Sequence, residues 1–185
     1  MKKKFGQNFL RNKEIINEII NIAEIDENSI IYEIGPGDGA LTKEIINKNP
    51  KKFLSVEIDL SLKDQLNSLF VKKEHTLLFT DALKFDETSH FIGDAVVIGN
   101  LPYNISLKLL IKWIYQHSTK PWFKKMILMF QKEVAERIIS DENSKKYGRI
   151  TLITSCLFKV SKVLDISKDN FLPITKVDSI LLQFE

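Results

Sequence analysis

A chain of 185 residues is long enough to form one domain around a single sizeable core. Its 44% hydrophobic and 28% charged residues are ordinary for a folded domain and exclude a disordered chain. No apolar run approaches the roughly 20 residues that cross a bilayer. The basic residues 2–4 are followed by FGQN (residues 5–8), where a signal peptide would be apolar. We therefore expect a cytoplasmic protein with no membrane partner.

The charge balance weakly favours a polyanionic partner. Lys and Arg number 27 against 24 Asp and Glu, which gives a net charge of +3. Lys2–Lys4 and Lys145–Lys146 are candidate phosphate contacts, although a solvated charge run is the commoner role of such residues. A lone cysteine, Cys156, excludes an internal disulfide and fits a reducing compartment. The three histidines lie far apart in the sequence, so we predict no metal site.

Helical and extended patterns alternate along most of the chain. In chain order the apolar spacing predicts helix 13–23, strand 30–34, helix 41–47, strand 52–58, helix 60–70, strands 75–79 and 95–98, helix 106–115, strand 125–131 and helix 133–139. Strands that alternate with helices of about ten residues indicate βαβ units. The sequence therefore predicts an α/β fold, 1–185 as one domain, with helices on both faces of a mostly parallel sheet.

The C-terminal segment departs from this alternation. Residues 150–158 are apolar without a clear period, and we favour a helix there. Two strands, 160–166 and 177–184, close the chain without a helix-length spacer between them. We expect these two strands to pair as an antiparallel hairpin at the edge of a sheet of seven strands.

A glycine-rich run directly after the first predicted strand is the strongest local signal. The run EIGPGDG (residues 33–39) opens a helix, and its glycines allow a tight turn that a ligand can approach closely. Its alternating glycines differ from the dinucleotide pattern G-x-G-x-x-G, and no P-loop lysine follows. The spacing resembles the first motif of class I methyltransferases. We therefore predict a Rossmann-like, S-adenosylmethionine-dependent methyltransferase fold.

Two acidic residues follow at the ends of the next two strands. Glu57 lies about 20 residues after the glycines, at the position expected to bind a ribose diol. Asp81 follows the third strand and is expected near the adenine ring. Ligands of open α/β sheets bind beyond the carboxyl ends of the strands, where both residues fall. A helix or turn cap remains an alternative for a carboxylate here, most of all for Asp81.

The loop after the fourth strand, Asn100-Leu101-Pro102-Tyr103, suits catalysis at an exocyclic amine. The lone pair of the adenine amine is delocalised into the ring. The amide oxygen of Asn100 and the carbonyl of Leu101 can each accept one N–H, which favours a pyramidal, nucleophilic nitrogen. Pro102 constrains the loop, and Tyr103 offers a face on which an extruded base can stack. Asn-x-Pro is also common in plain turns, which is the alternative for this loop considered by itself.

Several motifs in order along the chain resemble the KsgA/RsmA family of small-subunit rRNA adenine dimethyltransferases. They are FGQNFL (5–10), GPGDGALT (35–42), GNLPYNIS (99–106), QKEVAER (131–137), YGR (147–149) and KVDS (176–179). The resemblance implies dimethylation of two adjacent adenines near the 3′ end of 16S rRNA in immature 30S subunits, a step of ribosome biogenesis. It also implies an N-terminal arm, residues 1–12, at the cofactor site. The implied cofactor contacts are Gln7, Asn8, Leu10, Gly35, Gly37, Glu57, Ile58, Asp81, Ala82 and Asn100.

The resemblance gives Phe171 a role that its own position would not. In the family an aromatic residue of an F-x-P segment flanks the target base, and FLP (171–173) occupies that place here. Without the resemblance, Phe171 reads as a core residue. Family members continue into a small helical domain that helps to grip rRNA, whereas this sequence ends at Glu185. We expect a shortened form that binds the cofactor, acts as a monomer and docks less well on the ribosomal particle.

Three other functions remain as alternatives. Erm enzymes share the fold and chemistry but methylate a 23S rRNA adenine, and they usually carry Ile where this chain has Leu101. DNA adenine methyltransferases normally carry a second proline at that position. A non-catalytic RNA-binding assembly factor could retain the fold alone, although the intact Asn100–Tyr103 loop argues against it.

Overall fold

The computed structural model describes residues 7–185. The candidate phosphate contacts Lys2–Lys4 and the first two residues of the motif at 5–10 lie outside the described residues.

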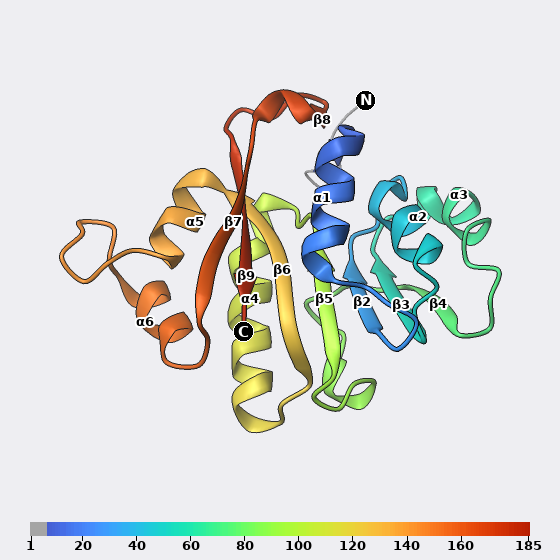
Figure 1. Ribbon diagram of the computed structural model, residues 1–185, viewed down its shortest axis with the longest axis horizontal. Coiled ribbons are helices and arrows are strands. Elements are labelled where there is room, and N and C mark those ends of the chain that lie inside the picture. The colour runs from blue at the N-terminus through green and yellow to red at the C-terminus, as the bar shows by residue number, and fades with distance from the viewer. Residues whose placement is uncertain (1–6) are drawn as a thin grey trace.

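A seven-stranded sheet forms the centre of the molecule, in the order β4-β3-β2-β5-β6-β9-β7 (Figure 1). The strands are β2 (Ile30–Ile34), β3 (Lys52–Glu57), β4 (His75–Phe79), β5 (Ala95–Gly99), β6 (Phe123–Gln131), β7 (Val160–Ile166) and β9 (Ser179–Phe184). The first five in chain order pair in parallel, and β9 runs antiparallel to β6 and β7. The predicted mostly parallel sheet of seven strands is therefore confirmed.

Helices cover both faces of this sheet. They are α1 (Lys13–Ala23), α2 (Ala40–Asn47), α3 (Lys63–Asn67), α4 (Tyr103–Thr119), α5 (Lys132–Ile138) and α6 (Arg149–Ser155). Buried residues of α1 and α2 share one apolar cluster, and those of α4 and α5 share the other. Figure 1 accordingly shows α1 and α4 on opposite faces of the central strands. Each cluster includes alternate residues of the buried parallel strands, because successive side chains of a strand point to opposite faces.

Helix α1 shows how the local sequence sets such an element. The Asn12 side chain accepts hydrogen bonds from the N–H groups of Glu14 and Ile15, which are otherwise unpaired at a helix start. Apolar residues spaced three and four apart then form one buried face: Ile16, Ile19, Ile20 and Ala23. The helix is thereby fixed against the sheet directly after the predicted N-terminal arm.

Several element boundaries differ from those predicted. The helix expected over 60–70 is split into a 3₁₀ turn, Leu60–Leu62, and the short α3. Helix α4 begins three residues earlier than expected and ends four residues later. The predicted antiparallel hairpin is present, but its second strand, β9, inserts between β6 and β7, which leaves β7 at the edge. Helix α6 (Arg149–Ser155) covers most of the ambiguous stretch at 150–158, as favoured.

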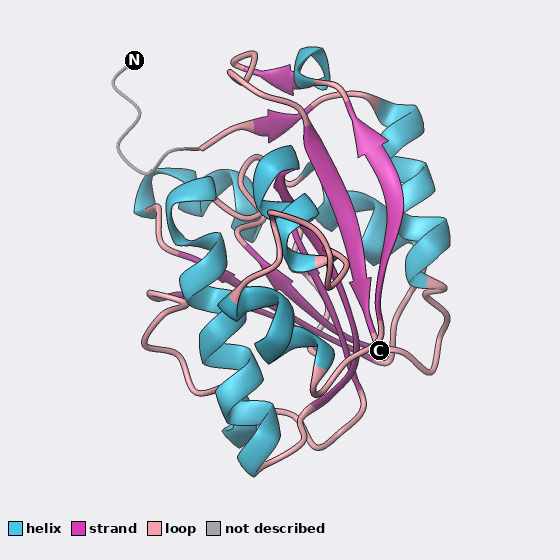
Figure 2. Cartoon of the chain, turned by 90° about the vertical axis from the view of Figure 1, so that its left-hand side faces the viewer, coloured by secondary structure: helices cyan, strands magenta, loops and turns pink. Residues whose placement is uncertain are grey.

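A separate two-stranded pair was not expected. Strand β1 (Phe9–Leu10) pairs antiparallel with β8 (Phe171–Leu172). Figure 2 shows the two short strands side by side, beyond the end of the main sheet. The Arg11 N–H also donates to the Asn170 carbonyl at 2.8 Å. The hairpin loop between β7 and β9 is thus joined to the beginning of the described chain.

None of the helices in residues 7–185 is both long enough and apolar enough to cross a membrane.

Candidate functional site

A pocket of about 860 Å³, including its part open to solvent, lies at the carboxyl ends of the parallel strands. The loops that follow β2, β3, β4 and β5 form its walls together with residues 7–10. Such a position is the usual ligand site of an open α/β sheet. The pocket is lined by all ten residues predicted to contact a cofactor: Gln7, Asn8, Leu10, Gly35, Gly37, Glu57, Ile58, Asp81, Ala82 and Asn100.

The glycine turn has the backbone conformation that its sequence suggested. Gly35, Gly37 and Gly39 have φ values of +66°, +58° and +83°, which other L-residues rarely adopt. A Cβ on Gly37 would lie 2.9 Å from the ring of Phe9, so this glycine makes room for β1. A Cβ on Gly35 would meet no atom within 4 Å. The backbone at Gly35 is therefore open to close approach by a ligand.

Glu57 is buried at the end of β3 and holds the glycine turn in place. One carboxylate oxygen accepts the N–H of Gly37 at 3.1 Å, and the other accepts those of Ile58 and Asp59 at 2.8 Å each. Burial raises the pKa of this carboxyl, although the three N–H groups oppose that change. Glu57 therefore presents a preorganised acceptor beside the glycine turn.

Glu33, the first residue of the glycine motif, is a part of the site to which the sequence assigned no role. Its Oε2 accepts hydrogen bonds from Thr42 at 2.8 Å and Ser55 at 3.2 Å. Its Oε1 has no hydrogen-bond partner among the described residues. Burial raises the pKa of Glu33 to about 7, and the charge of nearby Glu57 adds to the effect. The signal in the sequence was an acid two positions before Gly35, at a strand end.

Asp81 lies at the pocket, as predicted, and its side chain also caps a turn, which was the alternative role. It lines the pocket, and its Oδ1 also accepts the N–H of Leu83 at 2.9 Å. Its main-chain carbonyl accepts the N–H groups of Lys84 and Phe85, which closes a tight turn. The turn fixes the wall of the pocket that Asp81 and Ala82 form.

The Asn100 side chain is oriented by the N-terminal segment. Its Nδ2 donates to the main-chain carbonyl of Asn8 at 2.8 Å. A carbonyl can only accept, so the amide group must face Asn8 with its nitrogen, and its oxygen is directed elsewhere. Leu101 is buried against Gly99, where a Cβ would lie 2.8 Å from the leucine side chain. Pro102 stands at the cap of α4, and Asn100, Leu101 and Pro102 all line the pocket.

The two predicted aromatic residues lie outside the pocket lining. Tyr103 shares a hydrogen bond of 2.6 Å with the hydroxyl of Ser179, which is buried at the start of β9. Phe171 is only 2% exposed, and it packs in the apolar cluster that includes Leu10, its partner in the β1–β8 pair. The cofactor residues and the Asn100 loop thus line one pocket, whereas these two aromatic rings do not line it, although Phe171 lies beside Leu10.

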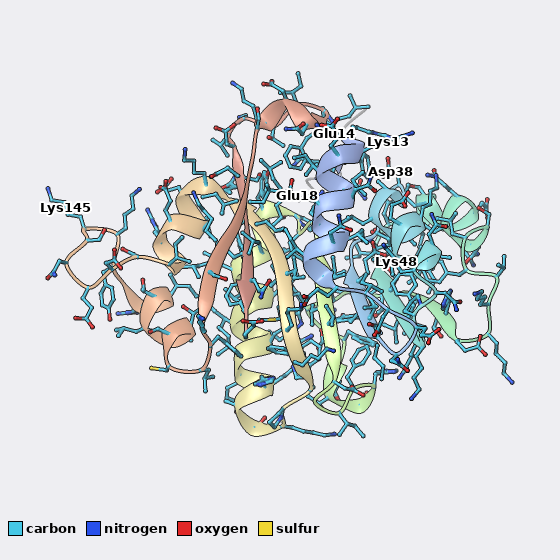
Figure 3. The ribbon with its side chains drawn as sticks, in the orientation of Figure 1. Lys13, Glu14, Glu18, Asp38, Lys48 and Lys145 are labelled. Atoms are coloured by element: carbon cyan, nitrogen blue, oxygen red, sulfur yellow. The ribbon has the colours of Figure 1, made fainter. Side chains whose placement is uncertain are left out.

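Residues 7–12 are attached to the site by polar contacts as well. Gln7 donates to a carboxylate oxygen of Asp59 at 3.0 Å. Arg11 forms an ion pair of 2.8 Å with Asp38 of the glycine turn. Figure 3 shows Asp38 at the end of the molecule where α1 begins. The described part of the N-terminal arm thus forms one wall of the pocket.

The remaining candidate phosphate contacts lie away from the pocket. Figure 3 shows Lys145 at the outer end of the loop between α5 and α6. Lys146 forms an ion pair of 2.5 Å with Glu136 of α5. The structure therefore places this basic pair on the periphery of the molecule.

Comparison with known proteins identifies relatives over the whole chain. The family model for ribosomal RNA adenine dimethylases matches residues 1–185. The ribosomal RNA small subunit methyltransferase A of Pelagibacter ubique is 44% identical over 183 residues, which cover 99% of this chain and 69% of that protein. The protein of the same name from Mycoplasmopsis synoviae is 40% identical and is likewise covered to 69%.

Solved structures agree with these sequence matches. A dimethyladenosine transferase from Plasmodium falciparum has a TM-score of 0.84 and 32% identity, over 95% of this chain and 62% of that one. The 23S rRNA methyltransferase ErmE has a TM-score of 0.79 and 26% identity, over 96% and 69% of the two chains. This chain thus spans about two thirds of the length of its relatives. It belongs to the ribosomal RNA adenine dimethylase family, a family of RNA adenine methyltransferases whose fold and chemistry imply S-adenosylmethionine as the methyl donor.

Proposed function

We propose that this chain transfers methyl groups from S-adenosylmethionine to the N6 atoms of two adjacent adenines near the 3′ end of 16S rRNA, in immature 30S subunits. The observation that carries the proposal is one pocket that joins the glycine turn to the Asn100 loop. The small-subunit name of the relatives at 40–44% identity favours this substrate over the 23S rRNA of ErmE. We propose 1–185 as one catalytic domain, monomeric and cytoplasmic.

The residues present fit the proposed cofactor. Its amino-acid end carries a sulfonium and an ammonium group, and the unpaired Glu33 oxygen offers a buried partner for positive charge. The open space at Gly35 lets the cofactor lie against the backbone. Glu57 would accept hydrogen bonds from the ribose diol, and Asp81 and Ala82 would contact the adenine. When bound, the cofactor supplies an electrophilic methyl group on sulfur.

Asn100 is oriented for the proposed reaction. Since its nitrogen faces the Asn8 carbonyl, its oxygen is free to accept an N–H of the target amine. The Leu101 carbonyl would accept the other N–H, and Pro102 would hold the peptide in place. The nitrogen lone pair is then directed at the methyl group, and the amine proton passes to water after transfer. Asn8 contributes a main-chain carbonyl, so its contact with Asn100 could not be predicted from residue types.

The proposed base contacts at Tyr103 and Phe171 place different demands on the two residues. Tyr103 is partly exposed at the start of α4, so a flipped base can stack on it without rearrangement. Phe171 belongs to the β1–β8 pair and its side chain is buried. A base contact at Phe171 would therefore need this pair to shift when the RNA binds.

The test is methyl transfer to immature 30S particles, with the modified nucleosides identified by mass spectrometry. Asn100→Ala should lower turnover more than tenfold while the cofactor Kd stays within a few fold. Asn47→Ala, an exposed position at the end of α2, is the matched control. Equal turnover of Asn100→Ala and wild type would refute the role of Asn100. Binding to the particle without any methyl transfer would favour the alternative of a non-catalytic assembly factor.

A further inference from the structure

A buried ion pair lies behind the wall of the pocket that Asp81 and Ala82 form. Lys112 of α4 and Glu87, which begins the 3₁₀ turn Glu87–Ser89, approach to 2.7 Å. The Glu87 side chain is fully buried and that of Lys112 is 18% exposed. Neither residue lines the pocket, and neither belongs to a motif identified in the sequence.

Lys112 binds the pocket wall directly. Its Nζ donates to the main-chain carbonyls of Ala82 at 2.7 Å and Phe85 at 2.5 Å, in addition to Glu87. The three N–H groups of the ammonium are thus shared among two carbonyls and both carboxylate oxygens of Glu87. The N–H groups of Leu83, Lys84 and Phe85 already bond to Asp81 within the turn. Lys112 therefore anchors the turn through the carbonyls of Ala82 and Phe85, which the hydrogen bonds within the turn do not use.

Glu87 is in turn held by several donors. Its Oε1 accepts from the Trp113 indole at 2.7 Å and from the Tyr32 hydroxyl at 3.2 Å. Burial, and then the charge of Glu87, raises the pKa of Tyr32, so the phenol keeps its proton and donates it. A buried ion pair is often no more stabilising than an apolar replacement of the same volume. A contribution to stability is therefore a weak explanation for this arrangement.

We propose that Lys112, held by Glu87, is a positioning residue that sets the turn of residues 81–85 at the adenine end of the cofactor pocket. Helix α4 begins at Tyr103, directly after the Asn100 loop, so the contact links that turn to the helix that follows the loop proposed to bind the target amine. The proposal rests on the cofactor function proposed above. It goes further by assigning the alignment of the adenosine portion to a residue outside the pocket.

Lys112→Met is the first variant to test. Calorimetry with S-adenosylhomocysteine and with 5′-methylthioadenosine, which lacks the amino-acid portion, should show both ligands weakened by the same factor, about tenfold. Turnover at saturating cofactor should stay within about threefold of wild type. Lys120→Met is the matched control, because exposed Lys120 donates to the Thr88 carbonyl at 2.6 Å but does not reach residues 81–85.

A double-mutant cycle with Asp81→Ala distinguishes positioning of the turn by Lys112 from a purely structural role of Lys112. If Lys112 acts through the turn, Lys112→Met should cost much less affinity once Asp81 is absent. Since Lys112→Met leaves the Glu87 charge unpaired, Glu87→Gln/Lys112→Met removes both charges, and Lys112→Arg keeps the charge with a different shape. Unchanged affinity for 5′-methylthioadenosine in a folded variant would overturn the inference. Failure of the wild-type chain to bind either ligand would instead overturn the proposed function.

Discussion

Glu33→Gln should change how the stability of the ligand-free protein depends on pH. Burial raises the pKa of the wild-type carboxyl from 4.5 to about 7. Between these values the folded state holds a proton that the unfolded state releases, so stability falls as pH rises through this window. At 1.36 kcal/mol per pKa unit, the loss by pH 8 is about 3 kcal/mol. Glutamine resembles the protonated acid and does not ionise, so the variant escapes this loss.

Urea unfolding at pH 4.5 and pH 8 measures the effect. Because other groups titrate in both proteins, the quantity to compare is the stability of Glu33→Gln relative to wild type. It should rise by about 3 kcal/mol, as an upper limit, between pH 4.5 and pH 8. Glu27→Gln, an exposed position, is the control and should show little dependence on pH. The same difference in stability at both pH values would refute the ionisation of a buried Glu33.

The pH dependence of cofactor affinity is a second test of the ionisation of Glu33. A cationic ligand at Glu33 favours its charged form, so wild-type affinity for S-adenosylmethionine should increase between pH 5.5 and 7. Glu33→Gln should bind more weakly at pH 7 and show a flatter profile in calorimetry. Parallel profiles for the two proteins would mean that Glu33 does not face the positive charge of the ligand.

Three further predictions concern the glycine turn and the Tyr103 contact. Glu57→Ala removes the acceptor for the Gly37 N–H and the proposed acceptor for the ribose, so the cofactor Kd should rise at least tenfold by calorimetry. An unchanged Kd would assign the ribose to another residue. Gly37→Ala combines a positive φ with a 2.9 Å approach to Phe9, and urea unfolding should show a loss of about 1–2 kcal/mol, or more if β1 is displaced. Tyr103→Phe and Ser179→Ala should each lower turnover a few fold, with the double variant no worse than either single one; additive losses would mean that the 2.6 Å hydrogen bond does not orient the ring.

Features with a local cause in the sequence were the ones that could be predicted. The strands and helices follow from apolar spacing, and the alternating glycines require φ values that few other residues adopt. The positions of Glu57, Asp81 and Asn100 follow because parallel strands place all of their carboxyl ends at one edge. The insertion of β9 between β6 and β7 could not be read in the same way, because two antiparallel strands leave the same pattern in either position.

The features that were missed depend on contacts between distant segments. Strands β1 and β8 contain two residues each, too few for any periodic pattern. The Asn8 carbonyl that orients Asn100 is a main-chain group, which any residue at that position would supply. Lys112 looks like one more polar residue on an amphipathic helix until Ala82 and Phe85 are placed beside it.

The β1–β8 pair connects the wall of the cofactor pocket, the orientation of the Asn100 amide and the burial of Phe171. Opening it would release the segment that walls the cofactor pocket, free the Asn100 amide to rotate, and uncover Phe171. Amide exchange at residues 9–10 and 171–172 should therefore slow in unison when cofactor is added. A protease cut within residues 7–12 should abolish methyl transfer even if the seven-stranded sheet stays folded. The start of the described chain would then couple cofactor binding to the exposure of Phe171.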